Sequence, residues 1–445
     1  MLDQEELRRI TQKVLSRSAA DQTEVVLLSE ETGLTRFANS RIHQNVAERN
    51  TQIRVRAVSG KKVGVTSTND LSDSAIDEVT DRALRVALLQ PDNPDFVSLP
   101  EPKPPPQAGS FAEATAECTP QLRAEAVSTI CRLAAEQHLV ASGAFTASTL
   151  QIAVANSLGV FAHAPTTVGD LTTVVMSEDS SGYASTTALD VTTIDAEKLA
   201  IEAVNKALSS GHPKPLEAGK YTVILEDYAV ATLLTYLSYL GFGALALQEK
   251  RSFMAGHLGK KIAGDNISIW DDGLDSSGLP VPFDFEGMPK ERVDLIKNGV
   301  ARSVVYDSYT ANRQGKQSTG HALPAPNTYG PLPGNLFMQT GEHTTSEMLA
   351  AVERGLWVTR FHYVNPLHPL KTVLTGMTRD GTFLIQNGEI TSGVKNLRFT
   401  QNVLEALGRV RMISRDSRLG RTFFGGVRVP SLLIDGFAFT GVTEF

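Results

Sequence analysis

Apolar residues recur along the chain with two different periods, and their alternation predicts the order of helices and strands. Residues 2–15, 74–89, 120–138 and 195–208 show helical spacing, which places their apolar side chains on one stripe. Between these helices lie segments such as EVVLLSEE, TQIRVRAV and LQIAVANSLGVFAH, whose β-branched content and flanking turn residues are typical of strands. The pattern of three strands followed by a helix therefore occurs twice.

The two halves of this region also resemble each other in sequence. Residues 37–40 (FANS) match 154–157 (VANS), and 81–84 (DRAL) match 205–208 (NKAL), at nearly equal separations. We interpret the match as a weak internal duplication. Residues 1–212 are therefore expected to form an N-terminal α+β domain with one mixed or antiparallel sheet and helices on one face.

Two segments rich in proline divide the chain. One lies inside the N-terminal region, and the other separates that region from the rest of the chain. Residues 91–109 hold seven prolines, which predict a stiff, extended linker because proline removes a backbone donor and fixes φ. A second Pro/Gly segment, GHPKPLEAG, precedes a strand-rich region. We expect residues 213–445 to form a β-rich C-terminal domain with few helices, at about 228–240, 346–354 and 402–407.

The densest turn signal lies in residues 373–391, VLTGMTRDGTFLIQNGEIT. Asn387-Gly388 suits a two-residue type I′ turn, because both positions of that turn need a positive φ. Asp380-Gly381 is interpreted in the same way, so the segment is predicted to be a meander with two reversals. Arg379 would then lie at the end of a strand, beside a loop, where side chains can meet a ligand.

Composition narrows the possible partners. The 445 residues carry a net charge of −7 and no run rich in Lys and Arg, which speaks against direct nucleic-acid binding. No apolar run of about 18 residues predicts a membrane span, and the acidic start of the chain is unlike a secretory signal. The two cysteines, Cys118 and Cys131, are too few for a disulfide framework, so a cytoplasmic location is expected.

The helix predicted at 228–240 is the first place to look for chemistry. Its apolar stripe comprises Val230, Leu233, Leu234, Leu237 and Leu240. Asp227 is the expected N-cap and Gly241 the expected terminator. The other face carries hydroxyls, and no His, Cys or carboxylate lies between Tyr228 and Leu247.

Several segments, in this order, resemble the TldD/PmbA family over nearly the whole chain. They are ANSRIHQNV, SFMAGHLGKKI, STGHA, GNLFMQTGEHTTSEMLAAVERGLWVTRFHYVN, TGMTRDGTFLIQNGEITSGVKNLRFTQ and PSLLIDGFAFTG. The resemblance implies a peptidase scaffold. In that family the TldD type carries His-Glu-x-x-x-His on the helix after the first C-terminal strand, with a Cys near the end completing a zinc site, and the TldE or PmbA type lacks them.

The chain departs from the TldD pattern at each of these positions. Alignment on Leu233-Leu234 places Thr235, Tyr236 and Leu240 where the His, Glu and second His belong, none of the nine histidines precedes a Glu, and no Cys follows Cys131. Zinc catalysis needs about three protein ligands and a nearby carboxylate. The resemblance therefore implies a PmbA/TldE-type subunit with no catalytic residue, no metal ligand and no cofactor of its own, and zinc in a TldD-type partner.

The expected ligand of this assembly is an extended, unfolded or modified peptide. Five polar side chains are candidates for contacting it: Arg360, His362, Tyr363, Asn365 and Arg379, which can hydrogen-bond a peptide backbone or a carboxylate. His362 and His368, with His257 and His343, could instead hold a metal, although their spacing fits no common zinc pattern. Thr344 and Glu347 predict a capping box that opens a helix.

The leading hypothesis is therefore the non-metal subunit of a heterodimeric metallopeptidase. A stand-alone peptide-binding scaffold, including one that forms a homodimer, is the alternative from another class. A metalloenzyme that uses a different set of histidines is the third.

Overall fold

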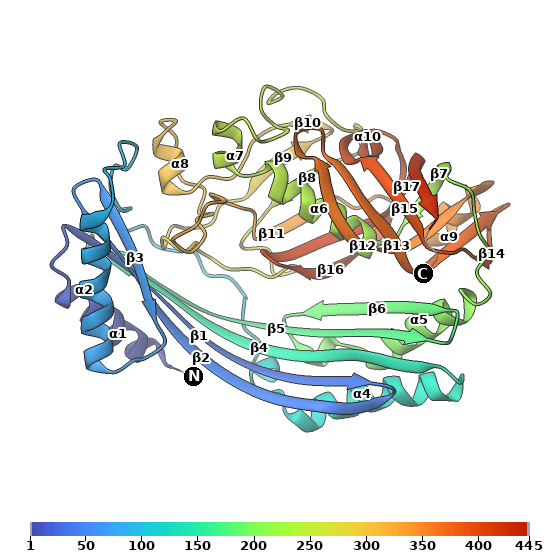
Figure 1. Cartoon of the computed structure of the whole chain (residues 1–445), viewed down its shortest axis with the longest axis horizontal. Helices are drawn as coiled ribbons and strands as arrows, with labels where there is room; N and C mark the ends of the chain where they lie inside the picture. Colours follow the sequence, from blue (N-terminus) through green and yellow to red (C-terminus); the bar gives the residue numbers. More distant parts are fainter. Residues whose placement is uncertain (1, 443–445) are drawn as a thin grey trace.

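The computed structural model describes residues 2–442 and contains two β-sheets that face each other (Figure 1). The first sheet is antiparallel, with six strands in the order β3-β2-β1-β4-β5-β6. These strands are β1 (Gln22–Ala38), β2 (Arg41–Ser59), β3 (Lys62–Thr68), β4 (Val140–Asn156), β5 (Phe161–Met176) and β6 (Ser181–Ala188). Four of them are long and curved, so the sheet is concave toward the C-terminal half of the chain (Figure 1).

The first sheet contains two copies of one structural unit, which meet at its centre. The chain order helix, three strands, helix occurs in α1-β1-β2-β3-α2 and again in α4-β4-β5-β6-α5. The two units meet where β1 pairs antiparallel with β4, with Leu28 opposite Ile152. Each unit buries its apolar helix stripes against the sheet and forms its own hydrophobic core.

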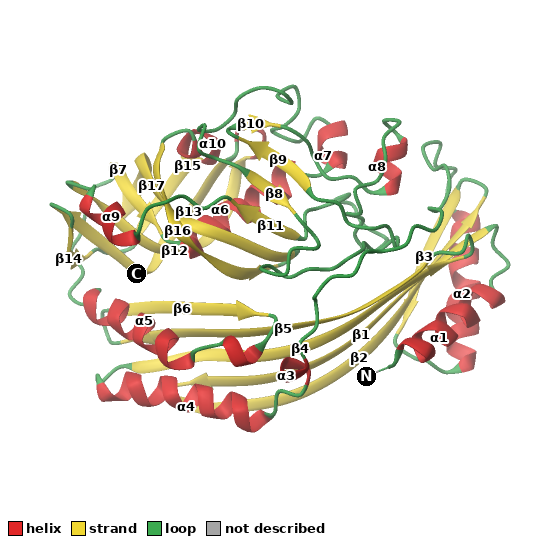
Figure 2. Ribbon diagram, turned by 180° about the vertical axis from the view of Figure 1, so that it is seen from behind, coloured by secondary structure: helices red, strands yellow, loops and turns green. Residues whose placement is uncertain are grey.

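All helices of the first unit and its repeat lie on the convex face of the sheet (Figure 2). They are α1 (Gln4–Arg17), α2 (Asp73–Leu89), α4 (Pro120–Glu136) and α5 (Ala196–Ser209), with the short α3 (Glu113–Ala116) and the 3-10 helix η1 (Val191–Thr193). Ser72 caps α2 and Thr119 caps α4 through hydrogen bonds from backbone N–H groups, as side-chain oxygens do at helix starts. Residues 91–112, which include the Pro-rich segment, form no helix or strand.

The second sheet has eleven strands in residues 219–442. Its main path is β10-β9-β8-β11-β17-β15-β13-β12-β7, and β7 also pairs with β17, so five strands close on themselves. The strands are β7 (Gly219–Leu225), β8 (Ile269–Asp271), β9 (Val293–Lys297), β10 (Val300–Ala301), β11 (Asn335–Met338), β12 (Arg354–His368), β13 (Val373–Gln386), β14 (Glu389–Gly393), β15 (Leu397–Asn402), β16 (Val410–Thr422) and β17 (Gly425–Val442).

Few helices accompany this sheet, and the longest of them is α6. They are α6 (Asp227–Gly241), α7 (Ala244–Gln248), α8 (Ser308–Asn312), α9 (Thr345–Ala350), α10 (Val403–Leu407) and the 3-10 helix η2 (Pro369–Lys371). Thr344 and Glu347 form the expected capping box at α9. The structure confirms the α+β class, with an antiparallel N-terminal sheet and a strand-rich C-terminal part.

The two Xaa-Gly pairs near residue 380 have different roles. Asn387 (φ 51°) and Gly388 (φ 80°) reverse the chain between β13 and β14, as predicted. The prediction of a reversal at Asp380-Gly381 is wrong: β13 continues through both residues, and its register against β12 shifts there. Successive positive φ values also suit a β-bulge, so Arg379 lies inside a strand and not at its end.

One further cluster joins the two sheets. Val26, Ile152, Val154, Ala162 and Ala164 on the concave face pack against Phe283, which comes from the loop that follows β8. The largest core lies around α6, β7 and β17. No helix among residues 2–442 is both long and apolar enough to span a bilayer.

Candidate functional site

A cavity of about 320 Å³ lies where α6 faces the first sheet, and we call it the α6 cavity. Its walls come from β6, α6, β12 and β16. The lining side chains with polar groups are Tyr183, Ser185, Asp227, Tyr228, Thr232, Thr235, Tyr236, Arg360, Arg418, Arg421 and Thr422. The cavity therefore lies between the two sheets and is polar on several sides.

The amphipathic pattern of α6 gives this cavity one of its walls. The predicted stripe of Val230, Leu233, Leu234, Leu237 and Leu240 is buried in the core. Pairs of partly buried residues alternate along the helix with pairs of buried residues, and the partly buried pairs face the cavity. The helix begins one residue earlier than predicted, with Glu226 as N-cap and no side-chain cap bond, and Phe242 takes the C-cap position expected of Gly241.

The three positions aligned with the metal motif are not brought together. Thr235 and Tyr236 line the α6 cavity, whereas Leu240 points into the core. The Thr235 hydroxyl donates to the carbonyl oxygen of Ala231 at 2.7 Å, and the Tyr236 hydroxyl donates to the carbonyl oxygen of Val364. Hydroxyls engaged with the backbone and a hydrocarbon do not provide the imidazole and carboxylate ligands that zinc takes, so this wall does not fit a zinc ion.

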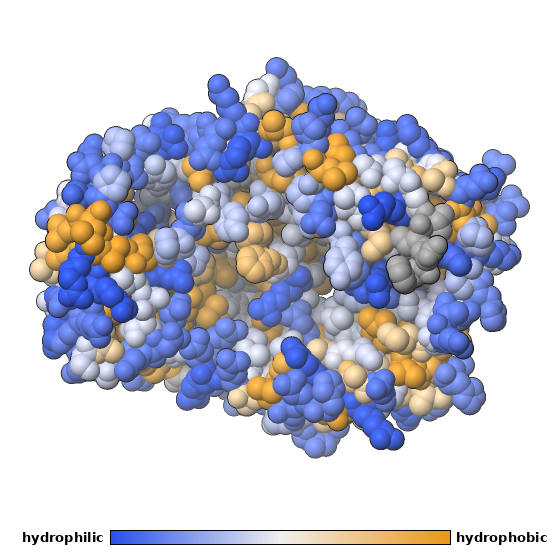
Figure 3. Space-filling model, viewed as in Figure 1, coloured by the Kyte–Doolittle hydropathy of each residue, from blue (hydrophilic) through white to orange (hydrophobic). Residues whose placement is uncertain are grey.

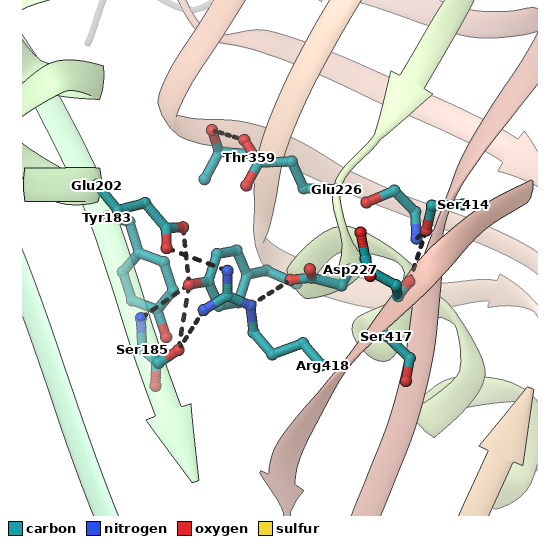
Figure 4. Close-up of polar contacts among 12 residues, drawn as sticks. Tyr183, Ser185, Glu202, Glu226, Asp227, Thr359, Ser414, Ser417 and Arg418 are labelled. Carbon is teal, nitrogen blue, oxygen red and sulfur yellow. Dashed lines mark hydrogen bonds and ion pairs between the residues drawn. The ribbon is translucent and has the colours of Figure 1, made fainter. Parts of the chain in front are cut away.

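A group of paired charges lies between β6, α5 and α6, beside the α6 cavity (Figure 4). The Arg418 guanidinium forms an ion pair with Asp227, with 3.0 Å between Nε and Oδ1, and with Glu202, with 3.0 Å between Nη2 and Oε2. It also donates to the carbonyl oxygen of Ser185 at 3.1 Å. The Tyr228 hydroxyl lies 3.0 Å from Glu202 Oε1 and accepts a hydrogen bond from the Ser185 N–H.

A second set of contacts extends this group toward β12. The Lys206 ammonium on α5 lies 2.8 Å from Glu202 Oε1 and 2.6 Å from Glu226 Oε2. Glu226 also accepts hydrogen bonds from the Trp357 indole N–H and, at 3.0 Å, from the Thr359 hydroxyl. Each of these acids thus contacts a cation on another element, and the pairs connect the first sheet and its helix α5 to the second sheet.

Burial and pairing shift the pKa values of these groups in different directions. Burial raises the pKa of Asp227 to about 6, although Arg418 partly opposes the shift. Burial would also raise the pKa of Glu202, but Lys206 and Arg418 outweigh it and the net shift is downward. Burial raises the pKa of the Tyr228 hydroxyl well above its ordinary value, so the hydroxyl remains protonated. Of Asp227 and Glu202, Asp227 therefore changes its charge closer to neutral pH.

Arg360 and Arg379, both expected to contact a peptide, lie opposite each other on β12 and β13 but line different cavities. Arg360 forms an ion pair with Asp380, and its Cζ lies 4.3 Å from the centroid of the Tyr183 ring. Arg379 lines a cavity of about 440 Å³ with Asp380 and Gly381. The bulge at Asp380-Gly381 thus places one carboxylate between the two arginines.

The other three candidates lie further along β12. The His362 and Tyr363 rings contact each other in a tilted arrangement, with centroids 4.3 Å apart, and the Asn365 amide donates to the Tyr363 carbonyl oxygen at 3.1 Å. Tyr363 has a positive φ of 48° and a side chain that is 72% exposed. None of the three lines the α6 cavity or the cavity at Arg379.

The histidines do not assemble into a metal site within the described part of the chain. Among residues 2–442, no group of three or more His, Cys, Asp or Glu side chains is arranged to hold a metal ion. His321 in the STGHA segment is fully buried and lies 2.7 Å from Asp271 through its Nε2. This pair is a contact within the core of the C-terminal region.

The comparisons with known proteins agree with this architecture. The family model described as PmbA/TldA metallopeptidase C-terminal domain matches residues 218–441, and the model of PmbA/TldA metallopeptidase domain 1 matches residues 23–87. The chain belongs to the TldD/PmbA family. Two similar proteins are an uncharacterized protein of Methanocaldococcus jannaschii and the metalloprotease PmbA of Escherichia coli O157:H7. The first is 31% identical over 185 residues, 41% of this chain and 44% of that protein, and the second is 28% identical over 247 residues, 54% and 51%.

A solved structure extends the likeness in fold over the whole chain. The crystal structure of TldE from Thermococcus kodakarensis has a TM-score of 0.89 at 21% identity and covers 98% of this chain and 100% of that one. By sequence, in contrast, the chain spans about half the length of the curated relatives that it matches. The TldD/PmbA assignment thus establishes a metalloprotease-like family and fold.

Sequence reasoning missed most of the polar residues at the α6 cavity. Tyr183 and Arg418 line the cavity, and Glu202 pairs with Arg418. These three residues belong to three elements, and none lies in a recognisable motif. The only local signal was the run Glu226-Asp227-Tyr228 directly after a buried strand, since polar residues at strand ends are frequently placed at sites.

Proposed function

We propose that this chain is the subunit without a catalytic metal in a heterodimeric peptidase of the TldD/TldE type. The observation that carries the proposal is the wall of the α6 cavity. The hydroxyls of Thr235 and Tyr236 donate hydrogen bonds to backbone carbonyl oxygens there. These two residues align with positions of the metal motif in the TldD type. In this proposal a TldD-type partner supplies the zinc ion, its ligands and the general base.

The role of this chain would be to hold an extended peptide between its two sheets while the partner cleaves it. Cavities between the concave sheet and the second sheet support this role, and Figure 3 shows the surface hollowed along the line where the two parts meet. The paired charges around Arg418 keep β6 and α6 in fixed relation. A fixed cleft lowers the entropy cost of ordering a flexible ligand.

Mixing the purified chain with a TldD-type partner tests the proposal. We expect no cleavage of an unfolded peptide by this chain alone, cleavage by the mixture, and loss of that cleavage on addition of a chelator. Co-purification with mass measurement should give one copy of each chain. Chelator-sensitive cleavage by this chain free of any partner would contradict the assignment.

A stand-alone peptide-binding protein is the second candidate, because two cavities lie between the two sheets of this chain. It predicts a monomer or a self-dimer that binds unfolded peptides and gives no added activity when mixed with a TldD-type subunit. The mass of the purified species and the mixing experiment separate the two candidates.

A further inference from the structure

A second cavity between the sheets, of about 220 Å³, differs from the α6 cavity in its walls, and we call it the Lys290 cavity. Leu150, Ile152 and Val168 line it from the concave sheet, and Leu279, Phe283 and Phe424 line it from the second part of the chain. It adjoins the apolar cluster that joins the two sheets. An apolar side chain placed there would be removed from water on most sides, which favours binding in proportion to the area buried.

One cation reaches this apolar cavity. The backbone N–H of Lys290 donates to the Pro282 carbonyl oxygen at 3.0 Å, which fixes the start of the side chain. Its stem passes over Gly273, where an added Cβ would lie 2.2 Å from Lys290 Cδ. Its Nζ ends beside Gly334, 3.2 Å from where a Cβ would be. Because Gly273 and Gly334 have no side chains, they leave space through which the Lys290 side chain reaches the cavity.

The Lys290 ammonium forms no hydrogen bond and no direct ion pair with any of residues 2–442, although its charge helps to lower the pKa of the nearby Asp271. Asp271 accepts from His321 Nε2 at 2.7 Å and from the N–H groups of Gly334 and Asn335 at 2.8 and 2.7 Å. Asp284 accepts from three backbone N–H groups. The ammonium therefore keeps hydrogen-bond donors that an incoming anion can use.

Arg421 and Glu30, which also line the cavity, both have partners within the chain. Arg421 at the rim forms an ion pair with Asp170, with 3.2 Å between Nη1 and Oδ2. Glu30 accepts a hydrogen bond from the Thr32 hydroxyl at 3.2 Å. Lys290 is thus the lining cation that forms no direct ion pair within residues 2–442.

We propose that the Lys290 cavity binds the carboxy-terminal residue of a peptide, with an apolar side chain against Phe283 and the terminal carboxylate on the Lys290 ammonium. A charge-assisted hydrogen bond orients the carboxylate, and the apolar walls select the side chain. The inference rests on the proposed function for the nature of the ligand, which is a peptide.

Binding of short labelled peptides to the whole chain, without any partner subunit, tests this inference. The probes are an amino-terminally labelled hexapeptide ending in leucine as the free acid, the same peptide amidated, and one ending in glutamate. By fluorescence anisotropy we expect the free acid with leucine to bind about 10-fold more tightly than either other probe. Equal affinity of the acid and the amide would overturn the proposal.

Variants of one residue connect that difference to Lys290. Lys290→Gln should abolish the preference for the acid over the amide, Lys290→Arg should keep most of it, and Lys103→Gln in the exposed linker should leave it unchanged. Retention of the full preference in Lys290→Gln would contradict the proposal. Val168→Phe, which narrows the cavity from the sheet side, should weaken binding of the leucine peptide even if Lys290→Gln folds poorly.

Three further outcomes test the identity of the ligand and distinguish the cavity assignment from the proposed function. Decanoate that binds more tightly than the leucine peptide would assign the cavity to a fatty acid and overturn the peptide proposal. A chain that prefers the free acid but gives no activity with a TldD-type partner would contradict the proposed function alone. Activity with the partner and no acid preference would contradict the cavity assignment alone.

Discussion

The α6 cavity and the Lys290 cavity lie between the same two sheets but use their charges in opposite ways. At the α6 cavity, Arg418 contacts Asp227 and Glu202 directly. At the Lys290 cavity, the ammonium forms no direct ion pair among the described residues, and the oxygens of the nearby Asp271 accept hydrogen bonds from His321 and two backbone N–H groups. The comparison indicates that the first set of charges stabilises the structure, whereas the second is available to a ligand.

Removal of Arg418 should have the largest effect on stability. Arg418→Met leaves Asp227 and Glu202 without their shared cation, and breaking a pair of this kind leaves uncompensated charge in a poorly hydrated place. Because the Arg418 side chain is still 31% exposed, we expect a loss of about 3 kcal/mol in the free energy of unfolding. Urea denaturation measures it. The exposed pair Arg411–Asp435 supplies the matched control, since Arg411→Met should cost about 0–1 kcal/mol.

The bulge next to the α6 cavity offers the next largest change. A Cβ at Gly381, where φ is 122°, would lie 2.5 Å from the Thr359 hydroxyl, which donates to Glu226. Gly381→Ala should therefore cost about 2 kcal/mol through backbone strain and the displaced hydrogen bond, read from thermal unfolding. Gly60→Ala, with φ 59° and open space around it, should cost about 1 kcal/mol. Equal costs at both glycines would show that the bulge carries no special contact.

Asp227 provides a test through pH. Its pKa is raised to about 6 in the folded chain, so the folded state resists ionisation and this group lowers stability as pH rises from about 4 through 6. Asp227→Asn removes that dependence. Relative to wild type, the free energy of unfolding of the variant should increase by about 2 kcal/mol between pH 4 and pH 7.5. A constant difference across this range would mean that Asp227 titrates at its ordinary pKa.

Lys290 should give the smallest change in stability. Because its ammonium forms no hydrogen bond or direct ion pair among the described residues, Lys290→Gln should alter the free energy of unfolding by less than about 1 kcal/mol. A loss as large as that of Arg418→Met, measured in the same urea titration, would mean that Lys290 is a structural charge and would remove the contrast between the two cavities.

Much of the fold could be predicted because its signals are local. The stripe on α6, the Asn387-Gly388 hairpin and the capping box at Thr344 each depend on residues within a few positions of one another. The Asp380-Gly381 pair shows where local reasoning stops. Its backbone preference for positive φ is the same in a turn and in a bulge, and the pairing of β13 with β12 decides between them.

The candidate site was predicted only where it depends on residue type. The sequence places hydroxyls and leucine at the positions of the metal motif, and it predicts a ligand contact for Arg360, which lines the α6 cavity. It could not join Arg360 to Tyr183, or show that His362, Tyr363 and Asn365 lie away from both cavities. Those relations depend on how β12 packs against the first sheet.

By itself, the sequence determined the repeated helix and strand pattern of the N-terminal half, the family, and the absence of a His-Glu pair, because these follow from residue identity and short-range periodicity. Only the tertiary structure decided that Arg418 meets Glu202, 216 residues away, and that Lys290 forms no direct ion pair among the described residues. Charges interact through space, and the distance between two side chains follows from the packing of the sheets and not from their separation along the chain.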